Sequence, residues 1–297
     1  MNANNEGTGA DNAWIKAMPV VFVLIWSTGF IVARFGMPQS PPMKFLAVRF
    51  ALSILCFLPW IVLAKVRWPV DRRQWRHLAV TGVLMHASYL GGVWAAVKAG
   101  MGSGLVALIV GLQPVLTAFW LTSRGGRISR QQWVGLMLGF VGLLMVVSRK
   151  FGSGGEAHWL NMALAVGALL GITAGTLYQK RFVAPCDVRT AGVIQLSAAL
   201  LVTLPLTLLE TETMHWNDNL MGAMAWSVLA LTLGGSSLLY LLIQRGAAAS
   251  VSSLMYLVPP CTALMAWLLF SEPITTLTIV GTLITALGVS LVVRPRK

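Results

Sequence analysis

A few side chains able to hydrogen-bond or stack lie deep within long apolar stretches of this sequence. His86 and Tyr89 are three residues apart, so they share one face if residues 75–97 form a helix. Other members of the set are Trp26, Ser27, Gln113, Gln179, Ser236, Tyr240 and Tyr256. Polar side chains within a membrane span mark binding sites and pathways. We expect this set to bind a small molecule; the alternative for each member is an interfacial anchor or a packed core residue.

Two adjacent prolines interrupt the apolar run LVPPCTALMAWLLFSEP, residues 257–273. A proline inside a helix removes a backbone donor and bends the helix, so Pro259 and Pro260 predict a break, as Pro114 does earlier in the chain. We expect these prolines to act as hinges beside a cavity. A tolerated kink is the alternative, because proline is commoner in membrane helices than in soluble ones. Glu272 ends the run, where it orders the following turn or takes part in gating.

The sequence does not suggest catalytic or metal-binding arrangements. Its nine Asp and Glu residues lie in the termini, in loops or at the ends of apolar stretches, which leaves no carboxylate relay within a span. Cys56, Cys186 and Cys261 are too far apart to predict a disulfide framework or a metal site. Ser103 with His86 is the nearest approach to a hydrolase pair, but no G-x-S-x-G motif is present. We therefore expect no catalytic residue, no metal and no cofactor.

The composition excludes a soluble globular protein. Of the 297 residues, 57 % are hydrophobic and 10 % are charged, whereas soluble domains carry about 25 % charged residues. Apolar stretches long enough to cross a bilayer core of about 30 Å recur along the chain. The ten stretches are residues 15–35, 44–64, 75–97, 102–122, 132–148, 159–179, 190–209, 220–243, 250–270 and 276–293. The sequence therefore predicts an all-α integral membrane protein with ten transmembrane helices.

The basic residues determine the expected orientation. If the N-terminus is cytoplasmic, 16 of the 22 Lys and Arg residues fall on the cytoplasmic side and 5 on the opposite side, with Arg49 inside the second stretch. The positive-inside rule then places both termini in the cytoplasm and accounts for the net charge of +13 without a nucleic-acid partner. The first stretch follows two acids and no basic residue, so we expect a retained helix and not a signal peptide.

Two further residue types have a default structural interpretation. We expect Arg49 to extend its long side chain to the membrane interface, with contact to a solute as the alternative. Glycines spaced by four residues let helices approach closely. Such spacing occurs at Gly135 and Gly139, and again at Gly167, Gly171 and Gly175. We expect packing seams there; the alternative is that the last two glycines leave room for a solute.

A weak internal repeat appears when the sequence is shifted by 146 residues. The shift places Pro260 on Pro114, Gly281 on Gly135 and Gly288 on Gly142 without any gap. Each half then holds five helices, an odd number, so the two copies cross the membrane in opposite senses. We expect two inverted five-helix repeats, residues 1–150 and 151–297, around a central cavity. Transporters that work by alternating access have this design.

Several short motifs resemble the EamA family of the drug/metabolite transporter superfamily. They are WSTGF at residues 26–30, the stretch from Pro42 that ends in Arg49-Phe50, the apolar run into SEP at residues 271–273, and the glycines of the last stretch. The resemblance covers nearly the whole chain and implies a ten-helix inner-membrane carrier that exports amino acids, metabolites or drugs. The overall pattern also resembles the YddG-type aromatic amino acid exporters. One departure is Gly126, which stands where the repeat would place a counterpart of Glu272.

The expected cavity is neutral and rich in aromatic, amide and hydroxyl groups. Such a site suits amino acids with aromatic or large apolar side chains better than a phosphate, which would require buried Lys or Arg. A multidrug, cation or sugar-type metabolite carrier of the same fold is the alternative. An intramembrane enzyme or a non-transporting membrane scaffold is more remote. We expect a small-molecule solute and the lipid bilayer as partners, no nucleic acid, and a monomer or a weak homodimer in the cell inner membrane.

Overall fold

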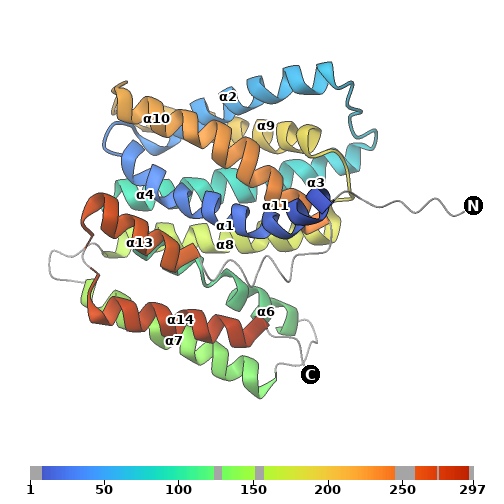
Figure 1. Cartoon of the computed structure of the whole chain (residues 1–297). Helices are drawn as coiled ribbons and strands as arrows, with labels where there is room; N and C mark the ends of the chain where they lie inside the picture. The colour runs from blue at the N-terminus through green and yellow to red at the C-terminus, as the bar shows by residue number, and fades with distance from the viewer. Residues whose placement is uncertain (1–8, 124–128, 151–156, 245–257, 273, 294–297) are drawn as a thin grey trace, which may run out of the picture.

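The computed structural model describes residues 9–123, 129–150, 157–244, 258–272 and 274–293. Within these ranges the regular elements are helices packed side by side, joined mostly by short loops (Figure 1). This confirms the expected all-α class.

The first half contains five successive helical segments. They are α1 (Gly9–Gly36); α2 (Pro42–Leu63); α3 (Arg72–Gly82) continued by the π-helical η1 (Val83–Ser88) and α4 (Tyr89–Lys98); α5 (Ser103–Val110) followed by α6 (Gln113–Ser123); and α7 (Arg130–Lys150). The third segment is continuous along its three parts. The fourth is interrupted between α5 and α6, directly before Pro114.

The second half repeats this order within the described residues. Its helices are α8 (Trp159–Phe182); α9 (Val188–Leu206) with the short 3-10 turn η2 (Thr207–Leu209); α10 (Asp218–Trp226) continued by the π-helical η3 (Ser227–Ser236) and α11 (Ser237–Gln244); α13 (Val258–Phe270); and α14 (Thr276–Val293). The ten segments correspond to the ten apolar stretches expected from the sequence. The expected start of the ninth stretch, residues 250–257, lies outside the described residues.

Five of these segments are both long and apolar enough to cross a membrane. They are residues 42–63, 72–98, 159–182, 188–209 and 218–242. Five further apolar helices are 10–17 residues long over their described apolar parts: residues 20–36, 103–117, 133–146, 258–270 and 276–288. Long and short segments both occur in each half, as expected of a duplicated membrane protein.

Polar side chains fix where several helices begin. Asp71 and Asp187 accept hydrogen bonds from the backbone N–H groups of Arg73 and Arg189, at the starts of α3 and α9. Asn217 does the same for Leu220 at the start of α10. These side chains satisfy backbone donors that have no partner within the helix.

Helices α7 and α14 run side by side at one edge of the molecule (Figure 1). A Cβ atom placed on Gly142 would lie 2.5 Å from the carbonyl oxygen of Gly281, and one on Gly288 would lie 2.5 Å from that of Gly135. The two contacts are equivalent, because Gly281 and Gly288 follow Gly135 and Gly142 by 146 residues. The expected seam at Gly135 therefore joins the two halves through glycine-to-glycine contacts.

The glycines of α8 behave differently from one another. Cβ atoms on Gly171 and Gly175 would meet Ser88 and Met85 at 2.7 and 2.4 Å, so both glycines pack against η1. Gly167 has no neighbour within 4 Å. The expected packing seam is thus correct for Gly171 and Gly175 and wrong for Gly167. In lipid, where the hydrophobic effect does not draw helices together, this close van der Waals contact stabilises the bundle.

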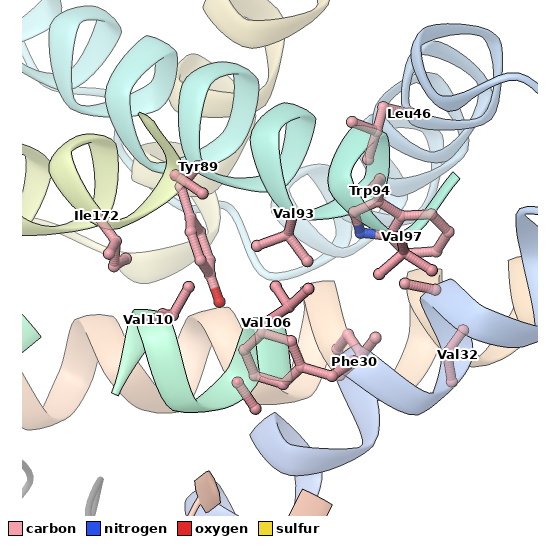
Figure 2. Close-up of a cluster of buried hydrophobic side chains, with 14 of the residues drawn as sticks. Phe30, Val32, Leu46, Tyr89, Val93, Trp94, Val97, Val106, Val110 and Ile172 are labelled. Atoms are coloured by element: carbon pink, nitrogen blue, oxygen red, sulfur yellow. The ribbon is translucent and has the colours of Figure 1, made fainter. Parts of the chain in front are cut away.

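The largest buried side chains gather where α1, α2, α4 and α5 meet. The rings of Phe45 and Trp94 stack with their centroids 4.3 Å apart, and both are fully buried. Figure 2 shows Tyr89, Val93 and Trp94 extending from α4 toward α1 and α5. This apolar layer packs α4 against its neighbours and thereby positions the side chains that face the centre of the bundle.

Candidate functional site

A cavity lies between the two halves and is partly open to solvent; its empty space of about 650 Å³ includes this open part. Both halves line it: α1, α2, η1 and α4 from the first, and α8, α9, η3 and α11 from the second. Six of the nine residues expected to bind a solute are among the lining residues: Trp26, His86, Tyr89, Gln179, Ser236 and Tyr240.

The other three expected residues lie elsewhere. The hydroxyl of Ser27 is fully buried and donates to the carbonyl oxygen of Val23. The side-chain amide of Gln113 donates to the hydroxyl of Thr176 at 3.0 Å, which joins α6 to α8. Neither residue lines the cavity. Tyr256 lies outside the described residues.

Aromatic rings form much of the cavity wall. Trp26 of α1 and Tyr89 of α4 lie parallel, at 3° between planes and 6.2 Å between centroids. Tyr89 extends from α4 toward Val110 of α5 (Figure 2), and Trp94 lines the same cavity one turn further along. Trp94 is 1 % exposed, so its ring does not lie on the outer surface of the bundle. Flat rings favour a solute with an aromatic or extended apolar surface.

Arg49 lines the cavity and does not reach the membrane interface. Its side chain is 3 % exposed, and its Nε atom donates to the hydroxyl oxygen of Thr232 at 3.0 Å. The guanidinium carbon lies 5.9 Å from the centre of the Trp94 ring. The expectations of a snorkelling arginine and of a neutral cavity are therefore both wrong. The reason is geometric: α2 turns this position toward the bundle centre, packing along α9 and η3.

Gln195 of α9 lines the cavity opposite the first half. It is 6 % exposed, its side chain interacts with the ring of His86, and its Nε2 atom has no hydrogen-bond partner among the described residues. A buried amide N–H without a partner is costly. The cavity therefore presents a donor that a bound molecule can satisfy.

Arg49 and Gln195 are equivalent under the internal repeat. They are 146 residues apart in the sequence. Arg49 contacts Thr232 of η3, and Gln195 contacts His86 of η1. His86 and Thr232 are also 146 residues apart, so the two contacts are equivalent. Each helix α2 or α9 thus contacts the π-helical segment of the other half. Shifting η1 by 146 residues gives residues 229–234, which lie inside η3. Such π segments are rare and frequently mark functional sites.

Glu272 lies away from this cavity, at the end of α13. Its Oε1 atom accepts hydrogen bonds from the backbone N–H and the hydroxyl of Ser103, at 3.2 and 3.1 Å, and lies 3.4 Å from a guanidinium nitrogen of Arg34. The carboxylate therefore caps the first turn of α5 and ties it to the ends of α1 and α13. Ser271 before it has φ 53°, a left-handed conformation that ends α13 and turns Glu272 inward.

Glu210 caps the start of α2 in a similar way. Its two carboxylate oxygens accept from the backbone N–H groups of Met43 and Lys44, at 2.8 and 2.9 Å. An anion at a helix N-terminus is stabilised by the unsatisfied N–H groups and the helix dipole. Two acids of the second half thus cap two helices of the first.

Pro114 occupies the second position of α6, where a missing N–H removes no intrahelical bond. Pro259 and Pro260 lie in the first described turn of α13, and the residues before Val258 lie outside the described part of the chain. Pro259 also packs on the break in the fourth segment: a Cβ on Gly111 would lie 2.7 Å from its Cγ atom. Pro259 therefore lies beside the interruption between α5 and α6. The expected break at Pro259 and Pro260, and the action of the prolines as hinges, stay predictions.

Comparison with known proteins identifies the family. Residues 14–148 and residues 159–294 each match the model of the EamA-like transporter family. The chain belongs to this family. The two matches lie in the two halves found by the internal repeat, which agrees with a duplicated membrane protein. The expectation that the protein is not an enzyme is confirmed by its membership of a transporter family.

Several relatives of this EamA-like protein match over long segments. It is 27 % identical over 208 residues to the inner membrane transporter YedA of Escherichia coli strain K12. This match covers 70 % of the present chain and 66 % of YedA, just under two thirds of that relative's length. It is 24 % identical over 284 residues to the transporter YvbV of Bacillus subtilis strain 168, covering 91 % and 88 %. A probable amino-acid metabolite efflux pump of Salmonella typhimurium strain LT2 is 22 % identical over 286 residues, covering 91 % and 92 %.

The fold also matches a solved structure. One crystal structure of a protein superposes with a TM-score of 0.70 and 16 % identity, over 93 % of this chain and 95 % of that chain. At this identity the likeness shows the fold alone. It agrees with the duplicated EamA-like architecture.

The Ser103–His86 hydrolase alternative finds no support in the geometry. The hydroxyl of Ser103 is buried against Glu272, whereas His86 faces Gln195 in the cavity. In the described residues no group of three or more His, Cys, Asp and Glu side chains could hold a metal ion.

Sequence reasoning gave too little weight to Arg49 and Gln195. The nearness of Arg49 to a helix end favours the membrane interface, and Gln195 is not among the residues expected to bind a solute. The offset of 146 residues pairs them directly. A pair of polar residues at equivalent positions in two apolar helices is the signal that could have identified both.

Proposed function

We propose that this transporter exports small metabolites across the cell inner membrane by alternating access, among them amino acids with aromatic or large apolar side chains. The central cavity is the observation that carries the proposal. Its wall contains the parallel rings of Trp26 and Tyr89, and it holds the buried guanidinium of Arg49. Rings accommodate an apolar side chain, and a guanidinium pairs with a carboxylate.

The relatives support the location and the solute class without defining either. One relative is named an inner membrane transporter and another an amino-acid metabolite efflux pump. The buried positive charge of Arg49 disfavours the alternative of a carrier for cationic drugs, because like charges in a poorly hydrated cavity repel strongly. A sugar-type solute is also less favoured, since the wall is largely aromatic and aliphatic.

The proposed motion uses the arrangement of the two halves. Pro259 packs beside the interruption at Gly111–Pro114, where a small change in helix direction would alter access to the cavity. Glu272 and Glu210 tie helix ends of the two halves together at one end of the bundle. The repeat boundary between residues 150 and 151, and the monomeric or weakly dimeric state, stay predictions.

The proposed orientation places both termini in the cytoplasm. Cysteine introduced at Val70, which is 99 % exposed in the loop before α3, should then be labelled by a membrane-impermeant maleimide only after the cells are opened. Cysteine at the exposed Thr211 should be labelled in intact cells. Both variants are made in a chain without Cys56, Cys186 and Cys261. Labelling of both sites from the same side would overturn the inverted-repeat topology.

The proposed solute class is tested by flux. Purified protein in proteoliposomes is assayed for uptake of radiolabelled phenylalanine, threonine and glutamate, with empty liposomes as control. We expect phenylalanine to be transported fastest, because its ring fits the aromatic wall. Preferred transport of glutamate would contradict the proposal, since a second carboxylate has no second cation among the described lining residues.

A further inference from the structure

The cavity carries a positive charge that the protein does not neutralise. The ion pairs among the described residues join Arg34 to Glu272, Lys98 to Glu212 and Arg189 to Asp187, and none involves Arg49. Among the described residues, the cavity lining contains no Asp or Glu. Within the same part of the chain, the Nε atom is the only donor of Arg49 with a side-chain or backbone acceptor, and this acceptor is the Thr232 hydroxyl. A buried cation without an ion-pair partner is unfavourable, so the cavity favours the entry of an anion.

A second donor faces the same space. Gln195 is more than nine-tenths buried, and its Nε2 atom has no partner among the described residues. Its position in α9 is equivalent to that of Arg49 in α2, so the two groups approach the cavity from opposite halves. A carboxylate has two oxygens, and each can accept from one of these donors. Arg49 and Gln195 thus supply the hydrogen-bond donors for a carboxylate in this cavity.

The single positive charge of Arg49 limits which charged groups the solute can carry besides a carboxylate. A carboxylate beside Arg49 makes the loaded cavity neutral, whereas an additional ammonium group leaves one uncompensated positive charge. Two of the hydroxyls that line the site are already engaged: that of Ser236 donates to the carbonyl oxygen of Leu231, and that of Tyr240 bonds the thiol of Cys186. A phosphate dianion would leave a negative charge instead, because Arg49 is the only Lys or Arg among the described lining residues.

We propose that Arg49 and Gln195 bind the carboxylate of a solute with one net negative charge, an aromatic or branched apolar monocarboxylate, in preference to the zwitterionic amino acid of the same skeleton. This rests on the proposed transport of apolar metabolites through the same cavity and narrows the solute class. The rings of Trp26 and Tyr89 accept the apolar part, and the two donors orient the charged end. Oxo acids, hydroxy acids and N-acylated amino acids have this chemistry.

Three probes that differ only near the polar end test the proposal. Isothermal titration of the full chain in detergent uses 3-phenyllactate, phenylalanine and phenethylamine. They share a phenyl ring and differ in whether a carboxylate, an ammonium group or both are present. We expect 3-phenyllactate to bind at least tenfold more tightly than phenylalanine, and phenethylamine to show the weakest binding.

Variants show whether the named donors cause this order. Arg49→Gln should remove most of the affinity for 3-phenyllactate and raise that for phenethylamine, because the repelling cation is gone; a gain of binding cannot arise from misfolding. Gln195→Leu keeps the charge and should weaken 3-phenyllactate several-fold while leaving phenethylamine unchanged. Arg67→Gln, at an exposed cation in the loop before α3, should match the parent for all three probes.

The outcomes separate this inference from the proposed function. If phenylalanine binds as tightly as 3-phenyllactate and still depends on Arg49, the carrier role stands and the preference for a monoanion is wrong. Unchanged 3-phenyllactate binding in both Arg49→Gln and Gln195→Leu would overturn the assignment of the donors. If no probe binds and no flux of phenylalanine is seen in proteoliposomes, the proposed solute class itself fails, and the inference with it.

Discussion

Arg49 of α2 and Gln195 of α9 stand 146 residues apart in the sequence and line the same cavity from opposite halves. Each faces a π-helical segment of the other half: Arg49 bonds Thr232, and Gln195 interacts with His86. The duplicated geometry has been kept while the chemistry has diverged, since one member is cationic and its counterpart is neutral. A symmetric framework therefore holds an asymmetric charge near its centre, where a solute with a charged end and an apolar end would take a defined orientation.

Thr232 should position Arg49. Its hydroxyl accepts from the Nε atom of Arg49 and donates to the carbonyl oxygen of Ser227 at 2.9 Å. Thr232→Val keeps the shape but leaves a buried charged N–H without its acceptor, which costs about 1–3 kcal/mol. We expect a lower melting temperature in detergent and several-fold weaker binding of 3-phenyllactate.

Thr232→Ser supplies the control, because it restores the hydroxyl and removes only a methyl group. It should recover most of the binding. Equal affinities for 3-phenyllactate in the parent and in Thr232→Val would show that Arg49 does not depend on this partner.

The glycine contacts between α7 and α14 should be sensitive to one added methyl group. A Cβ on Gly288 would lie 2.4 Å from the backbone nitrogen of Gly139, so Gly288→Ala forces the two helices apart. Overpacking of this kind costs typically about 1–3 kcal/mol. Gly167→Ala is the matched control, because no atom lies within 4 Å of its Cβ position. Thermal unfolding followed by circular dichroism should show a lower midpoint for Gly288→Ala alone; two equal midpoints would contradict the seam.

Glu272 should act through its capping of α5. In Glu272→Gln an amide oxygen can still accept from Ser103, whereas Glu272→Ala leaves the buried N–H of Ser103 without this acceptor. We expect Glu272→Gln to transport phenylalanine within a few-fold of the parent and Glu272→Ala to unfold at a clearly lower temperature. Complete loss of flux in a well-folded Glu272→Gln variant would instead indicate that the charge itself takes part in gating.

The ten helical segments could be predicted from the sequence because membrane spans are long and apolar, which is a local property. The duplication could be predicted because one ungapped offset aligns residues such as Gly288 with Gly142. The position of Arg49 could not. Its distance from a helix end is visible in the sequence, but the face of α2 on which it lies depends on packing against α9 and η3. Its partner Thr232 is 183 residues away.

The capping role of Glu272 could not be predicted from the sequence either. The sequence places an acid at the end of an apolar run, but its acceptor contacts are with Ser103, 169 residues earlier. The aromatic part of the cavity was easier to anticipate, because Trp26, His86 and Tyr89 are large or polar residues within apolar helices. Gln113 shows the limit of that reasoning, since an amide in a span can equally join two helices, as it does with Thr176.

Tyr89 should affect the choice of solute more than the amount of protein that folds. Its ring is parallel to that of Trp26 at the cavity wall, and aromatic contacts are worth about 0.5–1.5 kcal/mol beyond their buried area. Tyr89→Ala should therefore reduce proteoliposome uptake of phenylalanine several-fold more than uptake of threonine.

Gln113→Ala, which removes the bond to Thr176 outside the cavity, should lower uptake of both solutes by the same factor through stability. Tyr178→Ala is the aromatic control, because the Tyr178 hydroxyl bonds His77 at 2.8 Å, and Tyr178 does not line the cavity; it should leave the ratio of the two rates unchanged. An equal loss for phenylalanine and threonine in Tyr89→Ala would remove this ring from the solute-binding wall.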